Sequence, residues 1–240
     1  MKVAVFGAAG RMGTAVCDSV ERSGDLELVA RIEGRDARQK AVDSEAEVAV
    51  DFTTPSAVKD NVRFCLDNQI HVVVGTTGLS EGDLEDIRTW AERAAANAFV
   101  APNFAIGAVL MMAFAARAAP YFDNAEIVER HHERKLDAPS GTARRTAALM
   151  NAARARPWAQ ERADQTPWQG GDVGGIRIHS VRLPGSVAHQ EVILGSPGQT
   201  LTIRHDSIDR GSFMPGVLLA VRSVADRPGL TVGLEQLLQL

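Results

Sequence analysis

Hydrophobic positions in the first hundred residues follow two alternating patterns. Short apolar or alternating runs, typical of β-strands, lie at 2–6, 26–32, 48–52, 71–75 and 98–102. Between these runs the apolar residues recur at helical spacing, as they do from Met12 to Val20 and from Val58 to Leu66. Alternation of strands and helices with short links predicts parallel strands joined by right-handed crossovers.

Two helix starts are marked by local signals. Thr54 followed by Pro55 is typical of an N-cap and a first helical residue, and Ser80 stands before an acidic first turn. We expect helices to begin at both points.

The pattern changes after residue 103. An alanine-rich stretch predicts a helix over 106–119, "AEIVER" predicts a strand at 125–130, and a second helix is expected over 141–154. A polar segment with Trp, Pro and Gly, 157–175, predicts a loop. Three alternating runs follow, separated by "PGS" and "SPG", and predict antiparallel strands at 176–183, 187–195 and 199–205. A last helix is expected over 216–225, and the tail is expected to return to the first domain.

Composition limits the classes of partner. Hydrophobic content is 45%, charged content is 23% and the net charge is -4, which argues against nucleic acid or anionic membrane as a bulk partner. Cys17 and Cys65 form no CxxC motif, as expected in a reducing compartment. The longest uncharged stretch, 104–116, is well short of the roughly 20 residues that span a bilayer. We therefore expect a cytoplasmic protein.

A glycine-rich turn follows the first strand. In "VAVFGAAGRMG", Gly7 permits a tight turn, Gly10 lets the backbone approach a pyrophosphate, and Gly13 lets the helix lie close to the sheet. The spacing is GxxGxxG rather than GxGxxG, so glycines that only shape a turn are the alternative. The predicted dinucleotide contacts in this turn are Gly7, Ala8, Ala9, Gly10, Arg11 and Met12.

An acidic residue supports the nucleotide interpretation. Glu33 follows the second strand about twenty residues beyond the glycine turn, where a carboxylate binds ribose hydroxyls; a solvated surface acid is the alternative. Arg11 and Arg35 lie where a 2′-phosphate would bind, so both NADH and NADPH are expected as cofactors.

Two further turns follow the fourth and fifth predicted strands. Ligands of open α/β sheets bind beyond the carboxyl ends of the strands, so we expect these turns to contact the nicotinamide half of the cofactor. Ordinary connecting turns are the alternative. The residues are Gly75, Thr76 and Thr77 in the first turn, and Ala101, Pro102, Asn103 and Phe104 in the second.

The stretch "ERHHERKLDAPSGTA", 129–143, concentrates cations beside a helix start. Neighbouring histidines on a strand point to opposite sides, and no third ligand stands at HxH or HxxxH spacing, so a metal site is rejected. A solvated charged face is the alternative. Ser140, Gly141 and Thr142 at a helix N-terminus form an anion cradle, near Lys135 and His132. His131 is then available as an acid that titrates near neutral pH.

These motifs, with "DFTTP" and the later "VRLPGSVAHQEVILG" and "LTIRHDSIDRGSFMPG", resemble the 4-hydroxy-tetrahydrodipicolinate reductase (dihydrodipicolinate reductase) family over nearly the whole chain. The resemblance implies NAD(P)H-dependent reduction of a cyclic dicarboxylate, with loss of water, in the diaminopimelate route to lysine. It implies that His131 is the proton donor and acceptor and that Lys135 is a proton donor. It also implies that His132, Ser140, Gly141 and Thr142 contact the substrate.

The combined fold prediction is α/β: a Rossmann-like dinucleotide-binding domain at 1–104, completed by 215–240, and a smaller α+β domain at 105–214. The second domain is expected to have an open mixed sheet, to bind the substrate and, as the resemblance implies, to form a homotetramer. Another two-domain dehydrogenase, acting on an amino acid or a sugar, and a non-catalytic dinucleotide sensor are the rival interpretations. The rival dehydrogenase would not require both histidines before "PSGT", and the presence of both His131 and Lys135 counts against the sensor.

Overall fold

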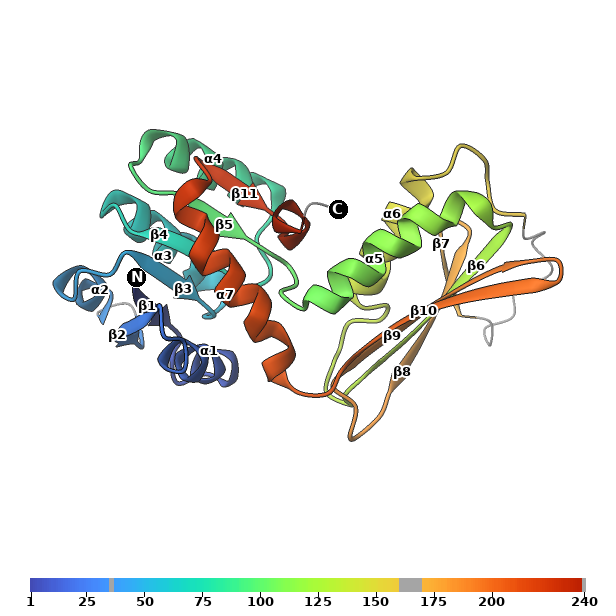
Figure 1. The fold of residues 1–240 in the computed structure, drawn as a ribbon, viewed down its shortest axis with the longest axis horizontal. Helices are drawn as coiled ribbons and strands as arrows, with labels where there is room; N and C mark the ends of the chain where they lie inside the picture. Colours follow the sequence, from blue (N-terminus) through green and yellow to red (C-terminus); the bar gives the residue numbers. More distant parts are fainter. Residues whose placement is uncertain (35–36, 160–169, 239–240) are drawn as a thin grey trace. The chain divides into compact units, whose positions relative to one another are not determined.

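The computed structural model describes residues 1–34, 37–159 and 170–238. The chain divides into two compact units (Figure 1). The first unit comprises Met1–Ile106 and Arg210–Leu240, and the second comprises Gly107–Asp209. Among the described residues, no helix is long and apolar enough to cross a membrane.

The first unit is built on a parallel sheet. Within the described residues it has six strands in the order β11-β5-β4-β3-β1-β2, and every neighbouring pair is parallel. The chain places β2 and β3 on opposite sides of β1, which creates the switch point where ligands bind in such sheets. The strands are β1 (Lys2–Phe6), β2 (Glu27–Ile32), β3 (Val48–Asp51), β4 (His71–Val74), β5 (Ala98–Val100) and β11 (Leu230–Val232).

Helices cover both faces of this sheet (Figure 1). Successive side chains of a strand point to opposite faces of the sheet. On β1 both sets are buried: Val3 and Val5 on one face, Ala4 and Phe6 on the other. The helices α1 and α7 contact each other, as do α3 and α4. Their bounds are α1 (Arg11–Glu21), α2 (Gln39–Asp43), α3 (Pro55–Asp67), α4 (Glu81–Arg93) and α7 (Met214–Ser223).

The two expected helix starts lie where the local signals placed them. Ser80 forms a full capping box with Asp83, and each residue's side chain accepts from the other's backbone N–H. Thr54 occupies the N-cap of α3, but its side chain makes no capping hydrogen bond. The Thr54 hydroxyl lies 3.1 Å from that of Ser56 instead.

The C-terminal segment is part of the first unit. After α7 and η5 (Val224–Asp226) comes β11, which pairs with β5 and forms an edge of the sheet. The hydrophobic pattern does not predict β11. The short helix η6 (Leu234–Leu237) follows it. Asn97 anchors the segment by donating to the carbonyls of Val224 and Ala225 at 3.0 and 2.9 Å. A Cβ added at Gly216 would lie 2.1 Å from the Phe104 carbonyl oxygen, so α7 packs directly on that turn.

The second unit contains a mixed sheet. Within the described residues it has five strands in the order β10-β9-β6-β8-β7, with β6 and β8 parallel and the other pairs antiparallel. The helices are α5 (Ile106–Ala118) and α6 (Gly141–Ala152), with the short turn η2 (Ala119–Tyr121), whereas the short turn η4 (Arg210–Phe213) belongs to the first unit. The strands are β6 (Asn124–His131), β7 (Gly171–Val173), β8 (Ile176–Arg182), β9 (Ala188–Ser196) and β10 (Gln199–Ser207).

Two expectations about this unit need correction. The strands β9 and β10 form the expected antiparallel pair, but β8 does not pair with β9, because β6 lies between them. The connection from β6 through α6 to β8 is a crossover, which makes those two strands parallel neighbours. The predicted loop at 157–175 also contains β7, and its Trp158 is buried and donates to Asn151 at 2.7 Å. The middle of that loop, 160–169, lies outside the described residues.

Candidate functional site

The glycine turn has the close contacts that its sequence predicts. Gly7 has a φ of +75°, and its N–H donates to the Ile32 carbonyl at 2.9 Å. A Cβ added at Gly7 would lie 2.5 Å from the Phe52 carbonyl oxygen, and one added at Gly13 would lie 1.9 Å from that of Gly7. Gly10 and Arg11 are exposed at the start of α1. The first turn of this helix is therefore open to a ligand.

The acidic partner lies beside this turn. The Glu33 carboxylate accepts a hydrogen bond from the backbone N–H of Ala9. A pocket of about 420 Å³ is lined by residues at the ends of β1, β2 and β3, including Gly7, Gly10, Glu33 and Arg38. Exposed Arg11 is at the start of α1, whereas Arg35 lies outside the described residues. The structure thus brings together the glycine turn and the acidic residue that the sequence predicts as dinucleotide contacts.

The turns after β4 and β5 lie against a shared aromatic core. The Phe52 ring would be 2.1 Å from a Cβ added at Gly75, and the ring centroids of Phe52 and Phe104 are 6.1 Å apart. Thr76, Ala101 and Phe104 are buried. The outer residues of the turns are Thr77 and Pro102, which are exposed, and Asn103, which is half-buried and whose side chain accepts from the Ala105 N–H at 2.9 Å.

A buried carboxylate that the sequence analysis missed connects two of these turns. Asp51, the last residue of β3, is fully buried, and its Oδ1 accepts from the Thr53 N–H at 3.0 Å and from the hydroxyls of Thr53 and Thr76 at 2.8 and 2.6 Å. Its Oδ2 accepts from Asn61 at 2.8 Å. The signal for Asp51 was a charged residue at the end of the apolar strand "VAVD". Its neutral donors connect the turn after β3 to Thr76.

The histidine stretch in the second unit begins at the end of β6. The His131 side chain is 14% exposed, and its Nδ1 lies 2.5 Å from Oε2 of Glu129, which is fully buried. Arg182, on the adjacent strand β8, donates to both oxygens of that carboxylate at 2.9 Å. Burial raises the pKa of Glu129, but hydrogen bonds, chiefly from His131 and Arg182, outweigh it and lower that pKa to about 2.

Glu129 and Arg182 were also missed in the sequence analysis. Both occupy inward positions of alternating strands, Glu129 in line with Ala125 and Ile127, and Arg182 in line with Ile178. A charge at an apolar-face position was the available signal.

The residues of the predicted substrate cradle lie at the start of α6. Ser140 is buried at the N-cap; its N–H donates to Glu129 at 3.1 Å and its hydroxyl accepts from the Ala143 N–H at 3.2 Å. The Ser140 hydroxyl therefore caps the helix. Gly141 is exposed, and a Cβ added there would meet no atom within 4 Å, while Thr142 is half-buried.

The two remaining cations differ in their surroundings. The Lys135 ammonium lies 2.8 Å from Asp137, and its hydrogen bond lowers the pKa of that carboxyl. The His132 side chain is exposed, and its carbonyl accepts from the Lys135 N–H at 3.1 Å, which closes a turn. The structure therefore gathers His131, Lys135, Ser140 and Gly141 around the end of β6 and the start of α6, and His132 lies at the surface of that turn.

The comparisons with known proteins identify the family. The family model described as "Dihydrodipicolinate reductase, N-terminus" matches residues 1–104, and "Dihydrodipicolinate reductase, C-terminus" matches residues 107–238. The chain belongs to the dihydrodipicolinate reductase family. The expected α/β fold, with a Rossmann-like first unit and a mixed sheet in the second, is the fold of this family.

The relatives cover the whole chain. It is 52% identical to 4-hydroxy-tetrahydrodipicolinate reductase from Mycolicibacterium vanbaalenii, with 100% of both chains covered. It is 51% identical to the protein of the same name from Nocardia farcinica, with 100% of this chain and 99% of the relative covered. A solved dipicolinate-bound dihydrodipicolinate reductase from Paenisporosarcina sp. TG-14 is 38% identical, has a TM-score of 0.87, and covers 98% of each chain.

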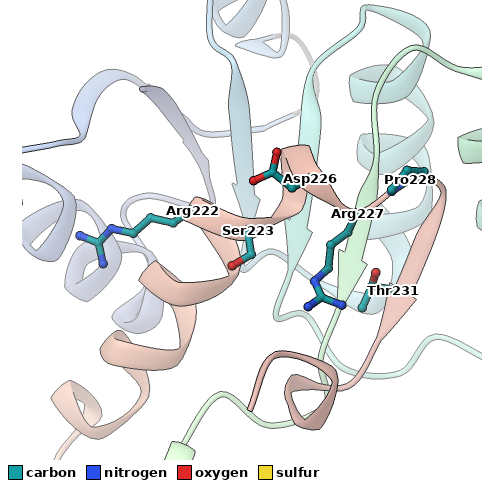
Figure 2. A pocket seen from close by; sticks show the side chains of 6 residues that line it. All are labelled: Arg222, Ser223, Asp226, Arg227, Pro228 and Thr231. Atoms are coloured by element: carbon teal, nitrogen blue, oxygen red, sulfur yellow. The ribbon is translucent and has the colours of Figure 1, made fainter. Parts of the chain in front are cut away.

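A further pocket, of about 590 Å³, lies outside the predicted site (Figure 2). It is lined by six residues between Arg222 and Thr231, in the C-terminal segment. None of the six is a site residue that the sequence predicts. Figure 2 shows Arg222 extending away from Arg227. The Arg222 guanidinium is already bound by Asp25 at 2.7 and 2.9 Å, so it does not converge with Arg227 on a ligand.

Asp51→Ala is expected to lower the free energy of unfolding by about 3 kcal/mol, because it leaves several buried donors without an acceptor. Asp67→Ala, which removes an exposed helical pair with Arg63 at 2.9 Å, is the control and is expected to cost under about 0.5 kcal/mol. Urea unfolding followed by circular dichroism measures both. Equal costs in the two variants would show that the Asp51 hydrogen bonds do not hold the turns.

Proposed function

We propose that the protein reduces 4-hydroxy-tetrahydrodipicolinate to tetrahydrodipicolinate, with loss of water, in the diaminopimelate route to lysine. The overall reaction consumes one NAD(P)H and one proton and yields NAD(P)⁺ and water. Family membership supports the reaction, and one structural observation supports its chemistry. His131, hydrogen-bonded to the buried Glu129 carboxylate, lies near the exposed first turn of α6.

The first unit fits the nicotinamide cofactor that the family implies. A Cβ at Gly7 or Gly13 would collide with backbone, so the close turn that opens the first turn of α1 requires glycine. When bound, the cofactor supplies the hydride that reduces the substrate ring. In our proposal Gly7 to Met12 hold the pyrophosphate and Glu33 holds a ribose. The nicotinamide half contacts the turns at Gly75 to Thr77 and Ala101 to Phe104.

Both NADH and NADPH are proposed as cofactors. The Glu33 carboxylate favours the free ribose hydroxyls of NADH. Arg38 lines the same pocket and Arg11 is exposed next to Gly10, which gives cations for a 2′-phosphate.

In the second unit, the proposed substrate is a dicarboxylate. One carboxylate accepts from the first backbone N–H groups of α6, at Gly141 and Thr142, with buried Ser140 shaping that turn. Lys135 exchanges its exposed partner Asp137 for a substrate carboxylate and serves as a proton donor. His132 provides a further contact from the surface of the turn. His131 delivers a proton to the ring as the hydride arrives at the neighbouring atom.

We further propose a cytoplasmic homotetramer that assembles through the sheet of the second unit. Large hydrophobic side chains are exposed at Val181, Leu183 and Leu201. Such exposure at a sheet supports an interface. Sedimentation velocity is expected to give four times the chain mass of 25.7 kDa, and a monomer would contradict this assembly.

The reaction is tested by following nicotinamide absorbance with 4-hydroxy-tetrahydrodipicolinate as substrate. The wild-type protein is expected to consume NADH or NADPH, and His131→Gln is expected to lower kcat by about 100-fold or more because it lacks the acid. Its affinity for NADH is expected to be unchanged. Turnover of His131→Gln within a few-fold of wild type would exclude His131 as the acid.

Gly141→Ala tests the carboxylate cradle. The added methyl group meets no protein atom within 4 Å, so the thermal midpoint is expected to stay at the wild-type value or rise slightly. The methyl group occupies the space of the substrate carboxylate, so the Kd for dipicolinate, measured by titration calorimetry, is expected to rise about tenfold. An unchanged Kd would place the carboxylate elsewhere.

A further inference from the structure

The buried Glu129 carboxylate contacts two of the predicted site residues of the second unit, His131 and Ser140. Its Oε2 receives the His131 ring and one Arg182 nitrogen, and its Oε1 receives the other Arg182 nitrogen and the Ser140 N–H. The side chain is 0% exposed, so no solvent competes for these positions. One carboxylate therefore contacts the proposed acid and the first residue of the proposed substrate cradle.

This carboxylate determines which nitrogen of His131 carries a proton. The lowered pKa of Glu129, about 2, means that the group is ionised at neutral pH, and an ionised carboxylate only accepts hydrogen bonds. The Nδ1 atom of His131, 2.5 Å away, must then be the donor. In a neutral imidazole with a protonated Nδ1, Nε2 is the basic atom. Nε2 is therefore the atom that gains and releases the proton during turnover.

Arg182 extends the same network to the rest of the stretch. Its Nε donates to the Lys135 carbonyl at 3.2 Å, and one terminal nitrogen donates to the Asp137 carbonyl at 2.6 Å. The other terminal nitrogen donates to its neighbour's carbonyl, that of Val181, at 2.8 Å. With the two bonds to Glu129, all five guanidinium N–H groups have acceptors. A lysine has three donors and no planar fork, so it cannot reproduce this arrangement.

We propose that Glu129 and Arg182 are positioning residues: Glu129 fixes the His131 tautomer with Nε2 toward the reaction, and Arg182 holds both Glu129 and the backbone of 135–137. This inference deepens the proposed function and rests on the role of His131 in it. The arrangement corresponds to the buried aspartate that orients the histidine in serine hydrolases, where the orienting acid touches no substrate.

Two variants of Glu129 separate orientation from folding. Glu129→Gln removes the charge and places an amide NH₂ group among side chains that themselves donate hydrogen bonds. The kcat is therefore expected to fall about 100-fold, while the KM for NADH is expected to stay within about twofold of the wild-type value. Glu129→Asp keeps the charge for Arg182 but withdraws the carboxylate from His131 by one methylene, and an intermediate kcat is expected. A fully folded Glu129→Asp with wild-type kcat would overturn the proposal.

Arg182→Lys has a matched control in Arg154→Lys. Arg154 also binds several backbone carbonyls in the second unit, those of Ala119, Phe122 and Pro157, away from His131. Arg182→Lys is expected to lower kcat about tenfold and to raise the KM for the dicarboxylate, because the stretch that carries Lys135 loosens. Arg154→Lys is expected to lower the thermal midpoint but to leave both kinetic constants unchanged. Equal kinetic effects in the two variants would reduce Arg182 to a structural role.

Nitrogen-15 NMR of the His131 ring gives a readout that does not depend on activity. The wild-type ring, when neutral, is expected to show a protonated Nδ1, and this signature is expected to be lost in Glu129→Gln and retained in Arg154→Lys. A wild-type ring with protonated Nε2 and bare Nδ1 would overturn the proposal even if no Glu129 variant folds. If the wild-type protein shows the expected tautomer but does not reduce the substrate, the proposed function fails and the orientation of His131 is still supported.

Discussion

A carboxylate without access to water is the constraint on which the second unit depends. Removing Glu129 from solvent is costly unless other groups donate to it, so the sheet and the following segment have to deliver those donors. Arg182 reaches it from the neighbouring strand, while Ser140 reaches it from the start of α6. Because the donors come from three parts of the unit, the same bonds that satisfy the charge also fix where α6 begins and which way the His131 ring faces.

The first unit uses a related arrangement with a different result. Asp51 is the last residue of β3 and is also fully buried, but its donors are the hydroxyl, amide and backbone N–H groups of neutral residues. It therefore fixes the shape of the turns at Thr53 and Thr76 without holding a cation. Glu129 holds a guanidinium and an imidazole, so its bonds also determine protonation. Each unit thus has a buried carboxylate near the carboxyl end of a strand, and the groups that donate to that carboxylate determine its role.

Local patterns in the sequence predicted elements well and their pairing less well. The five early strands, and the helix starts at Pro55 and Glu81, follow from periodicity and capping residues that act within a few positions. The pairing of β11 with β5 and the insertion of β6 between β8 and β9 depend on residues far apart in the chain. Turn residues alone could not distinguish a hairpin between β8 and β9 from two strands that share β6 as a neighbour.

The same limit applied to the candidate site. The motif from Glu129 to Ala143 predicted where the candidate site lies in the second unit, because histidines, a lysine and a helix start stand together in the sequence. The partner of His131 could not be chosen from the motif, since the donors that keep Glu129 ionised include Arg182, more than fifty residues later. The alternation along each strand placed the Glu129 and Arg182 side chains on the inward face of the sheet. Alternation shows only that two charged groups need partners, and it does not show that the two groups pair with each other.

Two of the three acidic residues of the histidine stretch, Glu129 and Asp137, differ in a way that suits ligand binding. Asp137 is 58% exposed in its pair with Lys135, and exposed pairs contribute only about 0–1 kcal/mol, so a carboxylate arriving from solution can replace Asp137 at little cost. Glu129 is buried, and removing one partner from such a pair costs about 3–5 kcal/mol, so no ligand displaces it from Arg182. In the proposed function, the stretch therefore combines a permanent anion, which orients the imidazole, with an exchangeable one, which keeps the ammonium paired until the dicarboxylate replaces it.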